Sequence, residues 1–210
     1  MAPESFYHEV VAFAKKYDII VLHDNAYSEL VFDGQSCGSF LSIPGAMEVG
    51  VEFNSLSKTY GLAGARIGFC VGNKEVVGML KTLKSNMDYG MFLPIQAAAV
   101  EALTGNQAVV AETRAAYEHR RDVLCDGLIE AGWHMEKPAG TMFVWAPIPS
   151  IYQDSEAFVA DLLDKTGVLV TPGSAFGPSG EGYVRMALVQ SEDTMKKIVE
   201  AVAASGIFGK

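Results

Sequence analysis

The spacing of apolar and polar residues predicts that helices and strands alternate from the start of the chain. Phe6, Val10 and Phe13 recur at helical spacing behind a proline and a glutamate, which predicts an opening helix. The run Ile-Ile-Val-Leu at 19–22 is short, apolar and rich in β-branched residues, and polar residues follow at 23–25. This pattern is typical of a buried parallel strand whose end carries functional side chains.

The same reasoning extends along the rest of the chain. Further strands are expected at residues 49–53, 67–71, 141–145, 168–171 and 183–188, and helices at 76–85, 92–103, 108–131, 155–165 with Ser155 as the N-cap, and from Ser191 onward. A loop rich in glycine and serine is expected at 33–45.

This order of elements predicts an α/β fold in two parts. The early β-α-β order suits an α/β portion over residues 1–95, and the later order suits a smaller α+β domain over residues 96–210. We place the join within residues 85–105.

Composition narrows the class of protein. The chain has 210 residues, half of them hydrophobic, and a net charge of −9. This composition is globular, and the acidity argues against a nucleic-acid partner or an anionic membrane surface. Neither a signal peptide nor an uninterrupted apolar run of membrane-spanning length is present, so we expect a cytoplasmic protein.

The cysteines point to no metal or disulfide chemistry. Cys37, Cys70 and Cys125 are odd in number and lack the spacing of a metal site. We interpret them as incidental thiols and expect no metal site.

The strongest chemical signal is the loop at residues 55–68. Ser55 and Ser57 offer hydroxyl groups, three glycines allow close approach to the backbone, and Arg66 supplies a planar cation suited to a phosphate. Lys58 offers an amine that a nearby cation and partial burial would help to keep neutral. The set suits a phosphorylated aldehyde cofactor, but on these residues alone a solvated glycine-rich loop is an equal alternative.

The full string resembles the cofactor-lysine motif of class I/II aminotransferases, which belong to pyridoxal-phosphate (PLP) fold type I. The matching segments are Ser55-Leu56-Ser57-Lys58, Gly61-Leu62-Ala63-Gly64-Ala65-Arg66-Ile67-Gly68 and, upstream, Asp24-Asn25-Ala26-Tyr27. The resemblance implies that Lys58 binds PLP covalently and that Ser55, Ser57 and Arg66 hold the cofactor.

The upstream segment completes this set. The resemblance implies that Asp24 pairs with the pyridinium nitrogen and that Tyr27 bonds the ring oxygen of the cofactor. Taken singly, Asp24 could be a turn aspartate and Tyr27 an ordinary core aromatic.

A third element lies near the end of the chain. The segments Pro172–Gly177 and Gly182–Ala187 are similar to a turn and a small-domain strand of the same family. The resemblance implies that Arg185 binds the substrate α-carboxylate, whereas an isolated arginine in a strand is usually a surface ion pair. The likeness covers essentially the whole chain.

The family's upstream phosphate-binding turn, stacking aromatic and Asn-Pro segment find no counterpart here. Residues 2–8 resemble the stretch directly after that segment in the family. We therefore expect this chain to correspond to the family's C-terminal portion, without the N-terminal half of the large domain. We also expect the chain by itself to bind PLP weakly or not at all and to be inactive or weakly active.

The function implied is transamination between an amino acid and a 2-oxo acid, by a parent enzyme that is a homodimer. The segment Asp88–Pro94 resembles the aspartate and LL-diaminopimelate branch, and Tyr89 is a candidate for reaching a neighbouring subunit, although a linker turn is favoured. Alternatives are a fold-type-I lyase or synthase, the effector-sensing domain of a transcription regulator, or a catalytically silent folding fragment.

Overall fold

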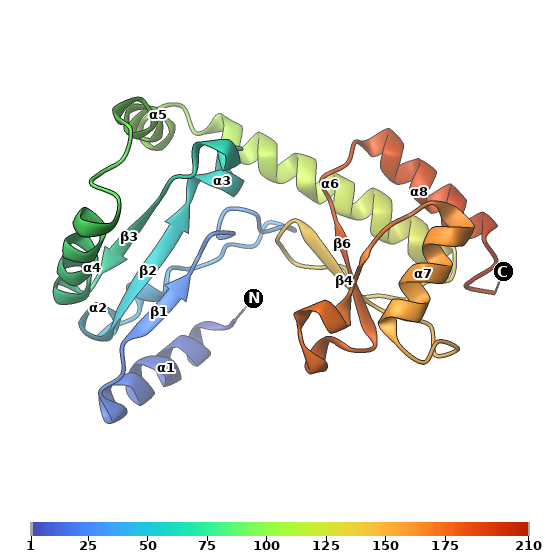
Figure 1. Cartoon of the computed structure of the whole chain (residues 1–210), viewed down its shortest axis with the longest axis horizontal. Coiled ribbons are helices and arrows are strands. Elements are labelled where there is room, and N and C mark those ends of the chain that lie inside the picture. Colours follow the sequence, from blue (N-terminus) through green and yellow to red (C-terminus); the bar gives the residue numbers. More distant parts are fainter. Residues whose placement is uncertain (1, 210) are drawn as a thin grey trace. The chain divides into compact units, whose positions relative to one another are not determined.

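A computed structural model describes residues 2–209 as two compact units (Figure 1). One ends at Arg114 and the other begins at Ala115, so the division falls within helix α6 (Ala108–Glu130). Compact units need not coincide with the domains of a family. The predicted domain boundary between residues 95 and 96 therefore stays a prediction. The mixed α/β fold class is confirmed.

The first unit contains a three-stranded sheet in the order β1-β2-β3. Strands β1 (Val21–Asp24) and β2 (Gly50–Ser55) are parallel, and β3 (Gly68–Gly72) runs antiparallel to β2. All three strands were predicted, and the parallel pairing of the first was also predicted. The apolar run at 19–22 enters the strand only at its second half.

Short and long helices accompany this sheet in the first unit. They are α1 (Glu4–Tyr17), α2 (Ala46–Val49), α3 (Leu56–Thr59), α4 (Lys74–Met87) and α5 (Leu93–Thr104), with a 3-10 turn at Phe40–Ser42. Helix α1 lies beside β1 (Figure 1), and a small core forms where Val11 meets Phe40, Ile43 and Ala46. The expected loop at 33–45 therefore contains a turn that is part of the core.

Strand β1 is less covered than its apolar sequence predicts. It is an edge strand, and the side chain of Leu22 is 66% exposed. The expectation of a buried strand is wrong for this chain, because Leu22 on one face of β1 is exposed to solvent.

The second unit is an antiparallel sheet covered by helices. Its strands are β4 (Phe143–Pro147), β5 (Thr171–Pro172) and β6 (Tyr183–Ala187) in the order β4-β6-β5. The strand expected at 168–171 is reduced to Thr171–Pro172, which pairs with Arg185 and Val184 of β6 before the chain turns at Gly173.

The core of this unit joins one face of the sheet to α6, α7 (Ser155–Thr166) and α8 (Glu192–Ala204). Trp133 stacks on Phe208, meets Phe158 edge to face, and donates its indole N–H to the Pro147 carbonyl over 2.8 Å. Leu124, Cys125 and Leu128 of α6 are buried in the same core.

Of the two predicted helix starts at serines, the one at α8 is confirmed and the N-cap of α7 is corrected. Ser191 caps α8 by accepting a hydrogen bond from the Thr194 N–H, as expected. The N-cap of α7 is Asp154, not Ser155. Ser155 is fully buried instead, and its hydroxyl donates to Glu181.

No helix within residues 2–209 has both the length and the apolar character that a membrane crossing requires.

In the second unit, the backbones at Gly173 and Gly180 approach so closely that position 173 tolerates only glycine. A Cβ on Gly173 would lie 1.9 Å from the carbonyl oxygen of Gly180, which is backbone and cannot move cheaply. We expect Gly173→Ala to lower the free energy of unfolding by about 1–3 kcal/mol, measured by urea denaturation.

Gly78→Ala is the matched control, because Gly78 lies in α4 with open space around it. Alanine should stabilise that helix by about 0.5–1 kcal/mol. Equal stability of the wild type and Gly173→Ala would contradict the close approach described here.

Candidate active site

The candidate site is built at the carboxyl ends of the two parallel strands. Asp24 is the last residue of β1 and Ser55 the last of β2, and parallel pairing brings both ends to the same edge of the sheet. The backbone N–H of Asn25 donates to the Phe53 carbonyl over 2.8 Å and extends the pairing past the strand. Because side chains alternate along a strand, Asp24, Phe53 and Ser55 share one face of the sheet.

Lys58 and Tyr27 come together beside this edge. The hydroxyl of Ser55 accepts a hydrogen bond from the Ser57 N–H over 3.1 Å and thereby caps the single turn of α3. That turn carries Lys58, whose Nζ lies 5.8 Å from the centre of the Tyr27 ring. Both side chains are half-buried.

Arg66 follows in a strained backbone conformation. Its φ is 53°, in the left-handed region that side-chain-bearing residues rarely adopt, and its guanidinium donates to the Ala63 carbonyl over 2.9 Å. Such strain is concentrated at functional sites and must be held by the surrounding fold.

The three glycines of the loop are at positions with different structural requirements. Gly61 has a φ of 66°, and a Cβ on Gly64 would meet no atom within 4 Å. A Cβ on Gly68 would lie 2.5 Å from the Asn54 carbonyl oxygen, so Gly68 is required by the packing of β3 against β2. Gly64 thus leaves open space beside the loop, whereas Gly68 serves the fold.

Arg185 lies in the second unit, on the outward face of β6. Its guanidinium carbon is 4.4 Å from the ring centres of both Phe143 and Phe176, so the cation is held between two aromatic faces. Trp145 pairs with Arg185 across the ladder and meets Phe176 edge to face. The two late sequence motifs therefore meet, because Phe176 belongs to the 172–177 turn.

The sequence interpretation missed Glu52. This glutamate is 4% exposed, and five groups donate to its carboxylate: His23 Nδ1, the side-chain amides of Asn25 and Asn54, the Ser39 hydroxyl and the Phe40 N–H, at 2.7–3.1 Å. Burial by itself raises the pKa of Glu52, but the side-chain hydrogen bonds outweigh it and hold the pKa at about 2. The available signal was a glutamate between Val51 and Phe53 in an otherwise apolar strand.

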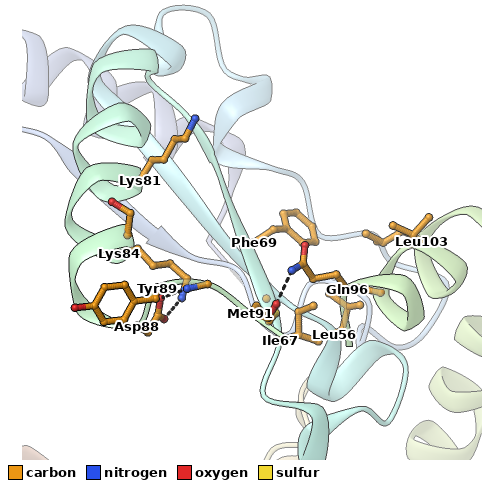
Figure 2. Close-up of a pocket in the computed structure, with 15 residues that line it drawn as sticks. Leu56, Ile67, Phe69, Lys81, Lys84, Asp88, Tyr89, Met91, Gln96 and Leu103 are labelled. Carbon is orange, nitrogen blue, oxygen red and sulfur yellow. Dashed lines mark hydrogen bonds and ion pairs between the residues drawn. The ribbon is translucent and has the colours of Figure 1, made fainter. Parts of the chain in front are cut away.

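A separate hollow lies in the first unit and shares residues of the loop. It has a volume of about 670 Å³ and is lined by Leu56, Ile67 and residues of β3, α4 and α5 (Figure 2). Tyr89 lies at its rim, with 93% of its surface exposed. Beside it in sequence, Asp88 forms an ion pair with Lys84. Lys58, Asp24 and Tyr27 are not part of this lining.

Among residues 2–209, no three His, Cys, Asp or Glu side chains gather as metal ligands. All three cysteines are free thiols, and burial raises the pKa of Cys125 to about 11, which makes it unreactive.

The sequence matches the family of class I and II aminotransferases over residues 1–202. It is 48% identical to the LL-diaminopimelate aminotransferase of Moorella thermoacetica over 95% of this chain and 51% of that protein. It is 46% identical to the glutamate-pyruvate aminotransferase AlaC of Escherichia coli over 95% of this chain and 49% of that protein.

Solved structures give the same picture. Apo-BacF from Bacillus subtilis has a TM-score of 0.94 at 36% identity and covers 100% of this chain and 54% of its own. A probable N-succinyldiaminopimelate aminotransferase from Thermus thermophilus has a TM-score of 0.90 at 32% identity, covering 98% and 55%. The chain spans about half the length of the relatives that it matches.

The low pKa of Glu52 gives an acid-dependent stability. Its folded-state pKa of about 2 lies below the ordinary value of 4.5, so the stabilisation is present above pH 4.5 and is lost as the pH falls toward 2. Between pH 4.5 and 2 we expect the unfolding free energy of the wild type to fall by about 2–3 kcal/mol more than that of Glu52→Gln. Urea denaturation at each pH measures this difference.

Glu48→Gln is the control, because Glu48 is an exposed glutamate of the same unit, paired with Lys15. Its curve should run parallel to that of the wild type. Parallel curves for the wild type and Glu52→Gln would contradict the low pKa.

Proposed function

Because the chain belongs to the class I and II aminotransferases, we propose that it carries the cofactor-binding half of a PLP-dependent active site. The reaction proposed for the whole protein is transamination between an amino acid and a 2-oxo acid. The observation that carries the proposal is the pair of Lys58 and Tyr27 beside the strand end that bears Asp24.

The residues present fit the chemical parts of PLP. An aldehyde requires an amine, which Lys58 supplies, and a basic ring nitrogen requires a carboxylate, which Asp24 supplies at the same edge of the sheet. A phosphate suits the Arg66 guanidinium and the Ser57 hydroxyl of the same loop. The open space at Gly64 leaves room beside them.

When bound, PLP supplies a ring that takes up the electron pair left on the substrate Cα as its proton leaves. Lys58 is the proposed base that removes this proton and returns one to complete the exchange of the amino group. The Asp24 carboxylate would keep the ring nitrogen protonated, and the Tyr27 hydroxyl would donate a hydrogen bond to the ring oxygen.

Arg185 is the proposed group for the substrate α-carboxylate. A guanidinium can form two parallel hydrogen bonds to a carboxylate, and its position between Phe143 and Phe176 restricts its rotation. We therefore propose a substrate with an intact α-carboxylate. Since relatives are named for LL-diaminopimelate and for glutamate and pyruvate, these are the first donors and acceptors to test.

The proposal concerns a whole protein of which this chain spans about half of the relatives' length. A homodimer is proposed from the family. For the 210-residue chain alone we expect weak PLP binding and little or no turnover.

Reductive labelling tests the role of Lys58 even when binding is weak. The chain is mixed with excess PLP and borohydride, and mass spectrometry of its peptides locates the attached cofactor. We expect Lys58 to be labelled at least about tenfold faster than Lys196, an exposed lysine paired with Glu192, because only the Lys58 site binds the rest of the cofactor.

Lys58→Arg is the matched variant that keeps the positive charge. It should abolish the preferred labelling and leave the rate at Lys196 unchanged. Labelling spread evenly over the lysines would overturn the proposal.

The role of Arg185 requires turnover, so the test uses a chimera in which this chain replaces the matching half of the E. coli glutamate-pyruvate aminotransferase. We expect Arg185→Lys to raise KM for glutamate by about 10–100-fold, because lysine cannot form the two parallel hydrogen bonds. Steady-state kinetics measures this change.

Arg120→Lys is the control, since Arg120 lies over the Tyr117 ring on α6. Its KM should match that of the unsubstituted chimera. An unchanged KM in Arg185→Lys would remove Arg185 from the substrate site.

A further inference from the structure

A buried carboxylate without a lysine or arginine among its hydrogen-bond donors needs a physical reason. Glu52 is 4% exposed, and of its five donors only His23 can carry a positive charge. Removing an anion from water is costly, and an apolar residue would pack in a strand at lower cost. The carboxylate therefore serves something other than maximal stability.

The donors show what it holds. They come from β1 (His23), from the residue after β1 (Asn25), from the 39–40 segment and from β2 itself. Oxygen Oε2 binds His23, Ser39 and the Phe40 N–H, while Oε1 binds Asn25 and Asn54. One side chain thus joins three separate segments of the first unit.

Asp24 lies between two of these donors in sequence. Because side chains alternate, His23 points to the face of Glu52, and Asp24 points to the opposite face, where Ser55 lies. The Asp24 carboxylate in turn accepts the Ala26 N–H over 3.3 Å. Holding His23 and Asn25 therefore fixes the backbone from which Asp24 projects.

The same bonds fix the start of the turn that carries Tyr27. The Asn25 carbonyl accepts the Ser28 N–H over 3.4 Å, and Leu30 donates to the Tyr27 carbonyl over 2.9 Å. Asn25 is itself buried, and its side-chain amide reaches Glu52 at 3.0 Å. The turn therefore begins at a residue that is tied to Glu52.

The groups around Glu52 define the tautomer of His23. An ionised carboxylate only accepts hydrogen bonds, so the proton must lie on His23 Nδ1. Nε2 then faces the Tyr7 hydroxyl of α1 at 3.4 Å. The titratable groups that face Glu52 are thus His23 and, beyond it, Tyr7.

We propose that Glu52 is a positioning residue for the cofactor site, which acts by fixing Asp24 and Tyr27 from the opposite face of the sheet. The inference rests on the proposed function for its consequence in PLP binding, but the tie between Glu52 and the 24–28 turn is a property of the chain itself.

The first measurement is amide hydrogen exchange in the full 210-residue chain. Glu52→Gln turns an acceptor oxygen into a donor facing other donors. We expect exchange at residues 25–30 to be at least about tenfold faster, with exchange in the second unit unchanged. Glu48→Gln should leave both regions unchanged.

The second measurement is PLP labelling of Lys58 by borohydride reduction, in a double-mutant cycle. Glu52→Gln and Asp24→Asn should each lower the preference for Lys58 about tenfold, and the double variant should be no worse than Asp24→Asn alone, because Glu52 acts through Asp24. Val11→Ala, which truncates a buried side chain that packs near Phe40 but makes no hydrogen bond to Glu52, should lower stability while keeping the preference.

The outcomes separate the two proposals. Unchanged exchange at 25–30 in Glu52→Gln, or multiplicative losses in the cycle, would overturn the positioning role. A wild-type chain with no preference for Lys58 overturns the proposed function in this chain, while the exchange result still decides whether Glu52 holds the turn.

Discussion

The parallel pairing of β1 with β2 is the constraint on which the candidate site depends. It places the carboxyl ends of both strands at one edge, so Asp24 and Ser55 end their strands on the same face of the sheet. The antiparallel return of β3 then requires the chain to turn back after β2, and the loop of that return carries Lys58 and Arg66. Without this pairing, Asp24 and the loop that carries Lys58 would not lie at the same edge of the sheet.

The sequence predicted the parts of this arrangement that leave local patterns. The apolar runs predicted the strands, and the serines, lysine, arginine and glycines of residues 55–68 suited a phosphorylated cofactor, with a solvated loop as an equal alternative. The resemblance to a family joined Asp24, Tyr27 and Arg185 to that loop. The contact between Lys58 and Tyr27 agrees with that grouping within the first unit.

The rest depends on long-range packing that no local pattern records. The role of Glu52 requires five donors from three segments, and of these only Asn54 is adjacent to the candidate loop in sequence. Asp154 replaces Ser155 as a cap because the buried Ser155 bonds to Glu181, which lies on a different part of the chain. Leu22 is exposed although its run is apolar, because exposure depends on what packs against that face of the sheet and not on the residues of the strand.

The backbone of Arg66 has a consequence for protein engineering. At a φ of 53°, glycine or asparagine would be the more comfortable residue, so a redesign that optimises only folding energy would be drawn to replace this arginine. Such a variant could melt at a higher temperature and still lose its only guanidinium in the 55–68 loop. Screens that select on thermal tolerance alone would therefore enrich chains that fold well and lack the guanidinium proposed here to bind the cofactor phosphate.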